Sequence, residues 1–419
     1  MLQKYKLGEL VDVARGASLS GDYYSTKGEY IRLTCGNFDY RNNCFKENTS
    51  KDNLFYAGAF KAEFLLEKGD IITPLTEQAI GLLGTTARIP ESGKYIQSQD
   101  IALIKCKVGK IDPTFCYYLI PSRLVRDQLS AAAQQTKIRH TSPDKIKDCT
   151  VWIPDLDDQK AIGRLLASLD EKIQLNKRIN DNLEAMAKQL YDYWFVQFDF
   201  PNEDGKPYKS SGGAMVYNEK LKREIPQGWH CYELNKWLEI KSGFAFKSET
   251  YISKGKFKVV TIKNVQDHHL DTSSCDYVNE IPHGMKEWCS LSVNDRLISL
   301  TGNCGRLCIV TEKDLLLNQR VGLLACNDEY IDYAYLLLSS EEYQTLSNNL
   351  AKGAAQANLS PVDLCKNIAV LPKLDVLEKF NRQIKPIVAS YIQNDIQIAD
   401  LTKQRDELLP LLMNGQASV

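Results

Sequence analysis

The chain has no long hydrophobic run, no strong net charge and few histidines. Its 419 residues carry a formal net charge of −1, and only 5 of them are histidine. No apolar stretch reaches the roughly eighteen residues that a membrane span needs, and the N-terminus does not have the layout of a signal peptide. We therefore predict a cytoplasmic protein with no membrane segment. Its overall charge does not attract nucleic acid, so any DNA-binding surface must be locally basic.

Motifs of the common catalytic classes are also missing. The sequence contains no Gly-x-x-x-x-Gly-Lys-[Ser/Thr] phosphate loop and no Gly-x-Gly-x-x-Gly after a strand. It contains no Asn/Asp-Pro-Pro-Tyr/Phe stretch of the kind that amino-methyltransferases carry, and no Ser/His/Asp or Cys/His arrangement. These absences predict a binding protein with no catalytic residue and no cofactor of its own.

Metal sites and disulfides are disfavoured by the spacing of the 12 cysteines. No Cys-x-x-Cys pair exists, and Cys304 and Cys308 have no second pair at ligand spacing. His268 and His269 are not a metal pair, because adjacent residues on a strand point to opposite faces. We expect buried free thiols and no metal.

The sequence does contain a long internal repeat. Leu7 returns as Leu234 and Thr34 returns as Thr261, so both pairs lie 227 positions apart (234 minus 7 and 261 minus 34). This period is too long for a solenoid unit of about 20–50 residues. It indicates a whole domain with its connector, used twice. A monomer built in this way can present two similar surfaces related by a pseudo-two-fold axis, a symmetry that duplex DNA shares.

Two long helices follow the two domains. Apolar residues spaced alternately four and three apart predict a helix from Asp158 to about Gln197, roughly 60 Å long. A second helix is expected from Val376 to about Met413, with a kink or a short preceding helix at Pro386. The two helices align without a gap from Pro154 and Pro372 onward.

The fold class that follows is α+β. We expect two similar β-rich domains separated by two long antiparallel helices that form a coiled coil, with pseudo-two-fold internal symmetry. The predicted parts are a first domain at 1–156, a first spacer helix at 157–200, a linker strap at 201–229, a second domain at 230–373 and a second spacer helix at 374–419.

The apolar seam of each helix is interrupted by an asparagine at the same heptad position, Asn176 in the first and Asn394 in the second. Two interpretations stay open. The asparagines form a buried pair that fixes the register at some cost in stability, or each is a polar residue where the seam drifts to the surface, since Ile179 and Met186 would extend the stripe another way.

Matched loops of the repeat supply the candidate binding residues. Amide side chains read adenine bidentately, guanidinium groups read guanine, and basic or hydroxyl-bearing loops contact phosphates. Strand-to-strand turns and solvated polar surface explain the same residues without any ligand. The candidates in the first copy are Thr76, Gln78, Gln99, Lys137, Arg139 and His140, and those in the second are Lys263, Asn264, His268, Thr301, Asn303, Gln319, Arg320, Gln356 and Asn358.

Four features of the chain carry a family resemblance. They are the duplicated opening from Leu7 to Gly16 and from Leu234 to Gly243, the segment from Gln159 to Ile173 before the long helix, the strap from Phe198 to Gly213 and from Arg223 to Trp229, and the ending from Gln404 to Gln416. With these features the chain resembles the specificity (S) subunit of Type I restriction-modification enzymes over essentially its full length.

The resemblance implies a non-catalytic subunit that recognises a bipartite, asymmetric DNA target, one half per domain, with the helices setting the gap. It also implies docking of two modification subunits, which bind S-adenosylmethionine and methylate adenine, and of restriction subunits that use ATP and Mg²⁺. The alternatives are a non-catalytic adaptor, a DNA-mimicking or assembly-blocking homologue, and a standalone nuclease or methyltransferase. The family's base-contacting residues vary, so none is carried over to this chain.

Overall fold

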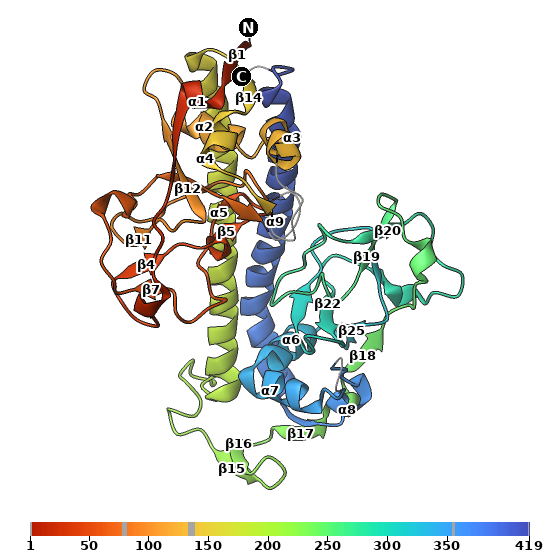
Figure 1. Cartoon of the computed structure of the whole chain (residues 1–419). Coiled ribbons are helices and arrows are strands. Elements are labelled where there is room, and N and C mark those ends of the chain that lie inside the picture. The colour runs from red at the N-terminus through yellow and green to blue at the C-terminus, as the bar shows by residue number, and fades with distance from the viewer. Residues whose placement is uncertain (1, 78–81, 133–138, 354–356, 418) are drawn as a thin grey trace. The chain divides into compact units, whose positions relative to one another are not determined.

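The chain forms two compact units. The computed structural model describes residues 2–77, 82–132, 139–353, 357–417 and 419 (Figure 1). Unit 1 comprises Met1–Ile173 together with Asp400–Val419, and unit 2 comprises Gln174–Ala399. The long helices α5 (Leu156–Tyr191) and α9 (Leu374–Met413) each contribute one segment to each unit. Each unit therefore combines a β-rich part with a pair of helix segments.

In its described residues, unit 1 contains two four-stranded sheets and three strand pairs. One sheet has the order β10-β8-β12-β2 and the other the order β11-β4-β7-β3. The strands of the first sheet are β10 (Ala87–Arg88), β8 (Ile71–Pro74), β12 (Ile101–Cys106) and β2 (Val11–Arg15). Those of the second are β11 (Tyr95–Ile96), β4 (Tyr30–Arg32), β7 (Phe55–Tyr56) and β3 (Tyr24–Ser25). The pairs are β1 (Gln3–Lys6) with β14 (Thr150–Ile153), β13 (Arg139–His140) with β9 (Thr76–Glu77), and β5 (Phe38–Asp39) with β6 (Cys44–Phe45).

Unit 2 also has two four-stranded sheets in its described residues. Its four-stranded sheets have the orders β18-β25-β22-β23 and β20-β19-β24-β21. The first contains β18 (Glu239–Ser242), β25 (Val321–Ala325), β22 (Arg296–Ser299) and β23 (Leu307–Ile309). The second contains β20 (Asp276–Val278), β19 (Phe257–Val260), β24 (Leu315–Leu317) and β21 (Ser290–Leu291). The strand pairs are β17 (His230–Glu233) with β26 (Ile368–Leu371), and β15 (Met215–Asn218) with β16 (Arg223–Pro226).

Short helices complete both units. Unit 1 has α1 (Leu7–Leu10), α2 (Pro113–Leu119), α3 (Arg123–Ala132) and α4 (Pro143–Lys147). Unit 2 has α6 (Ile331–Ser339), α7 (Glu341–Leu350) and α8 (Pro361–Cys365). α4 and α8 begin alike, because Ser142 and Ser360 each accept a hydrogen bond from a backbone N–H of the first turn and a proline follows.

The two copies of the repeat both have a glycine at the same place, Gly16 and Gly243, because no side chain fits there. A Cβ atom on Gly16 would lie 2.3 Å from the carbonyl oxygen of Ser98, and one on Gly243 would lie 2.3 Å from that of Leu317. The residue after each glycine forms a parallel bridge to this neighbouring segment. The backbones approach so closely that no side chain fits, so glycine is required at both positions.

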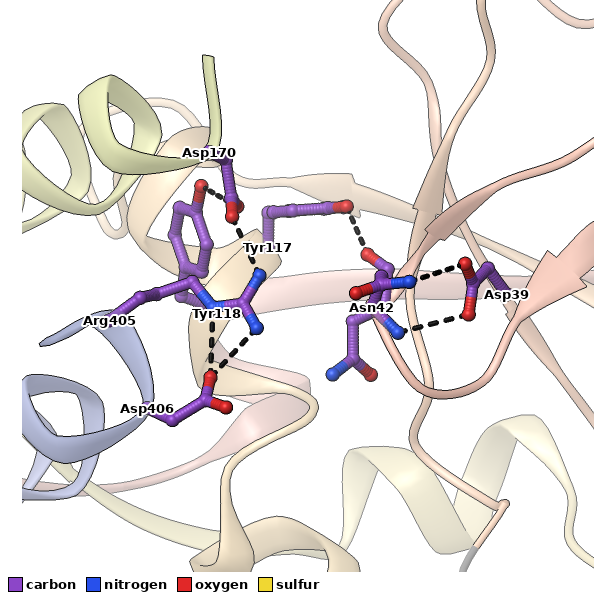
Figure 2. A network of polar contacts seen from close by, with 8 residues as sticks. Asp39, Asn42, Tyr117, Tyr118, Asp170, Arg405 and Asp406 are labelled. Carbon is purple, nitrogen blue, oxygen red and sulfur yellow. Dashed lines mark hydrogen bonds and ion pairs between the residues drawn. The ribbon is translucent and has the colours of Figure 1, made fainter. Parts of the chain in front are cut away.

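In unit 1 the helix segments pack antiparallel. The start of α5 and the end of α9 share one core, which contains Ile162, Leu166, Leu412 and Met413. Polar contacts add to this core (Figure 2). Arg405 of α9 donates through Nη1 to Asp170 of α5 at 2.9 Å, and the hydroxyl of Tyr118 on α2 donates to the same carboxylate at 2.6 Å. These contacts tie the β-rich part of unit 1 to both helix segments.

In unit 2 the opposite ends of the helices pair, again antiparallel. The end of α5 packs on the start of α9 through aromatic residues, with Phe195 and Phe380 ring centroids 4.8 Å apart. α5 continues as a π-helical turn, η4 (Asp192–Val196), which carries Trp194 and Phe195 into this core. With the unit 1 pairing, this confirms the expected α+β architecture of repeated β-rich domains with long antiparallel helices.

The segment after α5 is an ordered strap, held by aromatic stacking and hydrogen bonds. Phe200 stacks between Tyr208 and Trp229, with centroids 4.7 and 4.9 Å away. Ser210 donates through its backbone N–H and its hydroxyl to Asp199 at 2.7 and 2.6 Å. Tyr217 does not take part in the stack, since its side chain is exposed on β15.

The helix asparagines differ from the expected pair. Asn176 Nδ2 donates to Gln397 Oε1 at 3.2 Å, not to Asn394, and both Asn176 and Asn394 are half-buried. The buried asparagine of the seam is Asn180, whose Nδ2 donates to the Tyr391 carbonyl oxygen at 3.3 Å. Asn180 follows Leu166 and Ile173 at seven-residue spacing on the buried face of α5, so the heptad period holds and only the choice of asparagine was wrong.

Of the two features expected at Pro386, a kink or a short preceding helix, the short helix is not present, and the kink stays a prediction. α9 runs without interruption from Leu374 to Met413 through Pro386, so no separate short helix precedes the proline. Both Pro386 and Arg382 are exposed. The carbonyl group that loses its N–H donor at Pro386 therefore lies on the solvent side, which makes the proline tolerable.

Helix starts agree with the predicted boundaries to within two residues, at Leu156 and Leu374. The five-part division at 1–156, 157–200, 201–229, 230–373 and 374–419 remains a prediction, because compactness groups the helix segments with the β-rich parts. All 12 cysteines are free, and each is buried or half-buried. Within the described ranges, no helix combines the length and apolar character that crossing a bilayer requires.

Candidate nucleic-acid interface

Three segments of unit 1 that are distant in sequence converge at one edge. The backbone N–H of Leu75 donates to the Asp100 carbonyl oxygen at 2.8 Å, and that of Thr141 donates to the Leu75 carbonyl oxygen at 2.9 Å. β13 pairs with β9, so that His140 lies opposite Thr76. We call residues 75–77, 97–100 and 139–141 the first loop edge.

Unit 2 forms the same convergence. The backbone N–H of Leu300 donates to the Arg320 carbonyl oxygen at 2.9 Å, and that of Leu359 donates to the Leu300 carbonyl oxygen at 2.7 Å. We call residues 300–306, 318–320, 352–353 and 357–359 the second loop edge. The loops that the sequence matched one by one thus form a single surface in each unit.

The first loop edge presents two of the predicted side chains to solvent, Gln99 and His140. Thr76 is half-buried, with its Oγ1 3.1 Å from the Sγ of Cys35. Burial raises the pKa of the Cys35 thiol, so this neighbour stays uncharged. Arg139 lies on β13, where its backbone is described, whereas Gln78 and Lys137 lie outside the described residues.

The second loop edge presents four predicted side chains to solvent, those of Asn303, Gln319, Arg320 and Asn358. Thr301 is half-buried, and its hydroxyl donates to Asn358 Oδ1 at 3.2 Å. Lys263 is exposed on the neighbouring turn. Gln356 lies outside the described residues.

Asn264 is a wrong candidate, because its amide is used inside the protein. Its side chain is buried, and Oδ1 accepts hydrogen bonds from the backbone N–H and the hydroxyl of Thr261 at 2.8 and 2.9 Å. Its Nδ2 donates to the Asp271 carbonyl oxygen at 2.8 Å. Asn37 holds the matching turn in unit 1, where Oδ1 accepts from the Thr34 backbone N–H at 2.9 Å. The repeated asparagine is therefore a turn-stabilising residue and not a base-contacting one.

His268 is also placed inward. Its backbone has a φ of 61°, and its Nδ1 lies 3.3 Å from the hydroxyl of Tyr335 on α6. The Tyr391 hydroxyl of α9 donates to the His268 carbonyl oxygen at 2.8 Å. Burial lowers the pKa of the imidazole, which favours its neutral form. This histidine takes part in the packing between its loop and the helices, and a DNA contact by it stays a prediction.

Two basic residues were missed by the sequence argument. Lys352 is exposed, and its backbone exchanges hydrogen bonds with that of Asn358 at 3.1 and 2.8 Å. Arg306 donates through Nη1 to Gln266 at 3.2 Å and pairs through Nε with Asp267 at 3.2 Å. Arg306 lies in the matched loop that suggested Thr301 and Asn303, whereas Lys352 precedes its matched loop by one position and had no signal of its own.

The second loop edge and its neighbouring turn are locally basic. Lys263, Arg320 and Lys352 are exposed, and in the described part of the chain none of the three forms an ion pair. Unpaired cations beside exposed amides supply both phosphate and base contacts. The −1 overall charge therefore coexists with a local cluster of exposed cations.

Comparison with known proteins agrees with this geometry. The family model described as the Type I restriction modification DNA specificity domain matches residues 2–185 and again residues 226–402. The chain belongs to this family. The two matched ranges correspond to the two copies of the internal repeat, so the resemblance inferred from the sequence is confirmed. The chain is a specificity subunit of a Type I restriction-modification system.

Relatives cover most of the chain. The Type I restriction enzyme MjaIX specificity subunit of Methanocaldococcus jannaschii is 27% identical over 317 residues, which cover 73% of this chain and 69% of the relative. The HindI specificity subunit of Haemophilus influenzae is 22% identical over 374 residues, which cover 77% and 81%. The crystal structure of the S subunit from M. genitalium has a TM-score of 0.59 at 16% identity, covering 98% of this chain and 96% of that one. It shares the fold.

Proposed function

We propose that this specificity subunit binds a bipartite, asymmetric DNA target, with one half contacted by each loop edge. The observation that carries the proposal is the convergence of the same three segments in both units with different exposed side chains. Exposed amides and a guanidinium group are the groups that distinguish base edges in the major groove. A shared scaffold with divergent side chains supports two half-sites of different sequence.

The long helices set the gap between the half-sites in this proposal. α5 and α9 are each unbroken along their whole length, which supports a fixed separation rather than a variable one. Because the two contacts would be linked, losing one should remove nearly all specific binding through lost effective concentration.

Partner proteins supply the chemistry in this proposal. Two modification subunits would dock on the chain, bind S-adenosylmethionine and methylate adenine, and restriction subunits would add ATP- and Mg²⁺-dependent activity. The chain itself would be a non-catalytic, cytoplasmic component. Much of the phosphate contact would come from the partners, since the chain as a whole has a net charge of only −1.

Methylation mapping of the reconstituted complex tests the proposal. Arg320→Ala should relax the sequence requirement in only one half of the target, because one base contact contributes about 1–3 kcal/mol of discrimination, or roughly 5- to 150-fold. Gln99→Ala should affect only the other half.

Lys313→Ala is the matched control for charge. Lys313 is exposed near the opposite end of β24 from Gln319, so its loss should leave both half-sites unchanged. A complex whose methylation pattern ignored Arg320→Ala and Gln99→Ala, alone and combined, would contradict the assignment of the loop edges.

A further inference from the structure

A cavity lies between α5, α6, α9 and the His268 loop, entirely within unit 2. Its volume is about 290 Å³, close to the lower end of the range of about 300–1,000 Å³ for small-ligand sites. Apolar and aromatic side chains form most of its wall, including Leu183, Tyr335, Leu336, Ile387, Val388 and Tyr391. We call it the α6 cavity.

Unit 1 shows what fills the equivalent place. The gap-free alignment of the long helices shifts residue numbers by 218 (372 minus 154), so Ala187 matches Arg405 and Val388 matches Asp170. The same shift places the start of α2 at Pro113 on the start of α6 at Ile331, so Leu336 matches Tyr118. In unit 1 those three polar residues form the network of Figure 2, with the Arg405 guanidinium 2.9 Å from Asp170. In unit 2 all three matching residues line the α6 cavity. The cavity therefore corresponds to the position of an arginine side chain that unit 2 does not possess.

The charges around the α6 cavity are acidic. Lys188 pairs with Asp192 at 2.9 Å, and Asp332 pairs with the buried Arg296 at 2.6 Å. The remaining lining carboxylates are Glu184 and Asp181, and no ion pair within the described residues involves either. The carboxyl group of Glu184 is half-buried on the cavity side of α5.

Glu184 has a raised pKa, as expected for a partly buried carboxyl group with no cation beside it. Burial is the main cause that raises its pKa, with the charge of Asp181 second, to about 7. A positive guest would offset both effects, because an opposite charge nearby favours the ionised form. Three tyrosine rings, those of Tyr191, Tyr335 and Tyr391, also line the space, and aromatic faces attract cations.

We propose that the α6 cavity binds a guanidinium or amidinium group carried on an apolar body. The planar cation would bond to Glu184, as Arg405 bonds to Asp170 in unit 1, and the apolar body would pack on Leu336 and Val388. Two sources carry this chemistry: an arginine side chain of a partner protein, and a free small cation.

Benzamidine is a suitable probe for the purified full-length chain, because its amidinium is planar and its ring is apolar. Isothermal titration should show saturable binding with one site per chain. Benzyl alcohol, which keeps the ring but has no charge, should bind at least about tenfold more weakly, the effect of one charge-assisted hydrogen bond. Equal affinity for both compounds, or no saturable binding of benzamidine, would overturn the proposal.

Variants locate the site. Ala187→Arg should supply the missing guanidinium from within the chain and abolish benzamidine binding. Gln189→Arg is the matched control, since it adds the same charge at an exposed position of α5 that does not line the cavity. Glu184→Gln should weaken binding about tenfold while leaving the fold intact. Unchanged affinity in both Ala187→Arg and Glu184→Gln would exclude this cavity as the site.

A separate experiment distinguishes the two sources of the cation, and this experiment rests on the proposed function. Titration is repeated after modification subunits are added. Loss of benzamidine binding assigns the guest to a partner arginine, and retained binding assigns it to a free small cation. Failure of DNA recognition would leave the measurement on the isolated chain unaffected, so the two proposals fail separately.

Discussion

The two units solve the same packing problem with opposite chemistry. Where α5 meets α9 beside α2, unit 1 has a guanidinium, a carboxylate and a phenol. Where they meet beside α6, unit 2 has alanine, valine and leucine around a cavity. The backbone positions correspond, yet one unit uses charge and the other leaves space. The repeat therefore preserves the backbone scaffold but not the side chains through which each β-rich part contacts the long helices.

Positions that the backbone requires are preserved in both copies. Gly16 and Gly243 allow a close approach of two backbones, and Asn37 and Asn264 each hold a turn with the same hydrogen bonds. The loop edges converge through equivalent backbone contacts but present different side chains. Such a division, with a constant frame and variable surface, suits a protein whose two halves recognise different partners or sequences.

Breaking the polar network of unit 1 should give the largest effect on stability. Removing one partner of a buried ion pair costs about 3–5 kcal/mol, and the partial exposure of Asp170 lowers the expected cost of Arg405→Ala to about 2 kcal/mol. A unit of this size should then melt about 4–8 °C lower, as differential scanning calorimetry can measure.

Lys188→Ala in unit 2 is the control for this variant. Lys188 and Asp192 form an exposed pair, with side chains 66% and 34% accessible, so its loss should cost less than about 0.5 kcal/mol. The triple change of Arg405→Ala, Asp170→Val and Tyr118→Leu gives unit 1 the residues of unit 2 and should recover part of the lost stability. If Arg405→Ala, Lys188→Ala and the triple variant all had the same melting temperature, the polar network of unit 1 would not contribute more to stability than the exposed pair of unit 2.

The helix seam offers a second contrast. The seam in unit 1 is apolar at Leu166 and Ile173, whereas Asn180 in unit 2 is buried with no partner for its Oδ1. Asn180→Leu should raise the stability of unit 2 by about 1–2 kcal/mol, or roughly 2–6 °C. Asn176→Leu, at a half-buried position, should change the melting temperature of unit 2 by less than about 1 °C. A loss of stability in Asn180→Leu would mean that the asparagine is required for packing.

The smallest expected effect is the pH dependence of stability that Glu184 causes. The residue at the equivalent position of α9 is Thr402. The pKa rises from 4.5 to about 7 on folding, so the folded state holds this proton more tightly than the unfolded state. Stability therefore falls as the pH rises from about 4.5 through 7.

Glu184→Gln should remove this penalty. With a discount for the partial exposure of the carboxyl group, the variant should melt about 2–4 °C above the wild type at pH 8, and the gain should shrink as the pH falls below 5. Thermal scans at the two pH values measure it. A gain that does not depend on pH would show that charge is not the cause.

The repeat, the long helices and the family were predictable because each depends on spacing that the sequence displays directly. Leu7 and Leu234 mark the domain starts, and the apolar heptads mark α5 and α9. The amide candidates were less predictable. Asn264 and Gln319 are both amides at strand ends, yet one is buried in a turn and the other is exposed, and that difference depends on the three-dimensional path of the loop.

Two other features depend on contacts between distant segments. Asn180 follows Leu166 and Ile173 at seven-residue spacing, but only the structure shows that it is buried while Asn176 is half-buried. The α6 cavity results from three small or apolar residues on different helices, none of which is unusual alone. The alignment that reveals the missing arginine was available in the sequence, but the space that it leaves was not.

Exchange of one domain tests the central claim most directly. Residues 1–156 are replaced by the corresponding domain of a family member with a different target, and the methylated sites are mapped in cells that also express the modification subunits. We predict that one half of the target changes, while the other half and the gap stay the same. An unchanged target, or a change in both halves, would contradict the proposal that each domain contacts its own half-site.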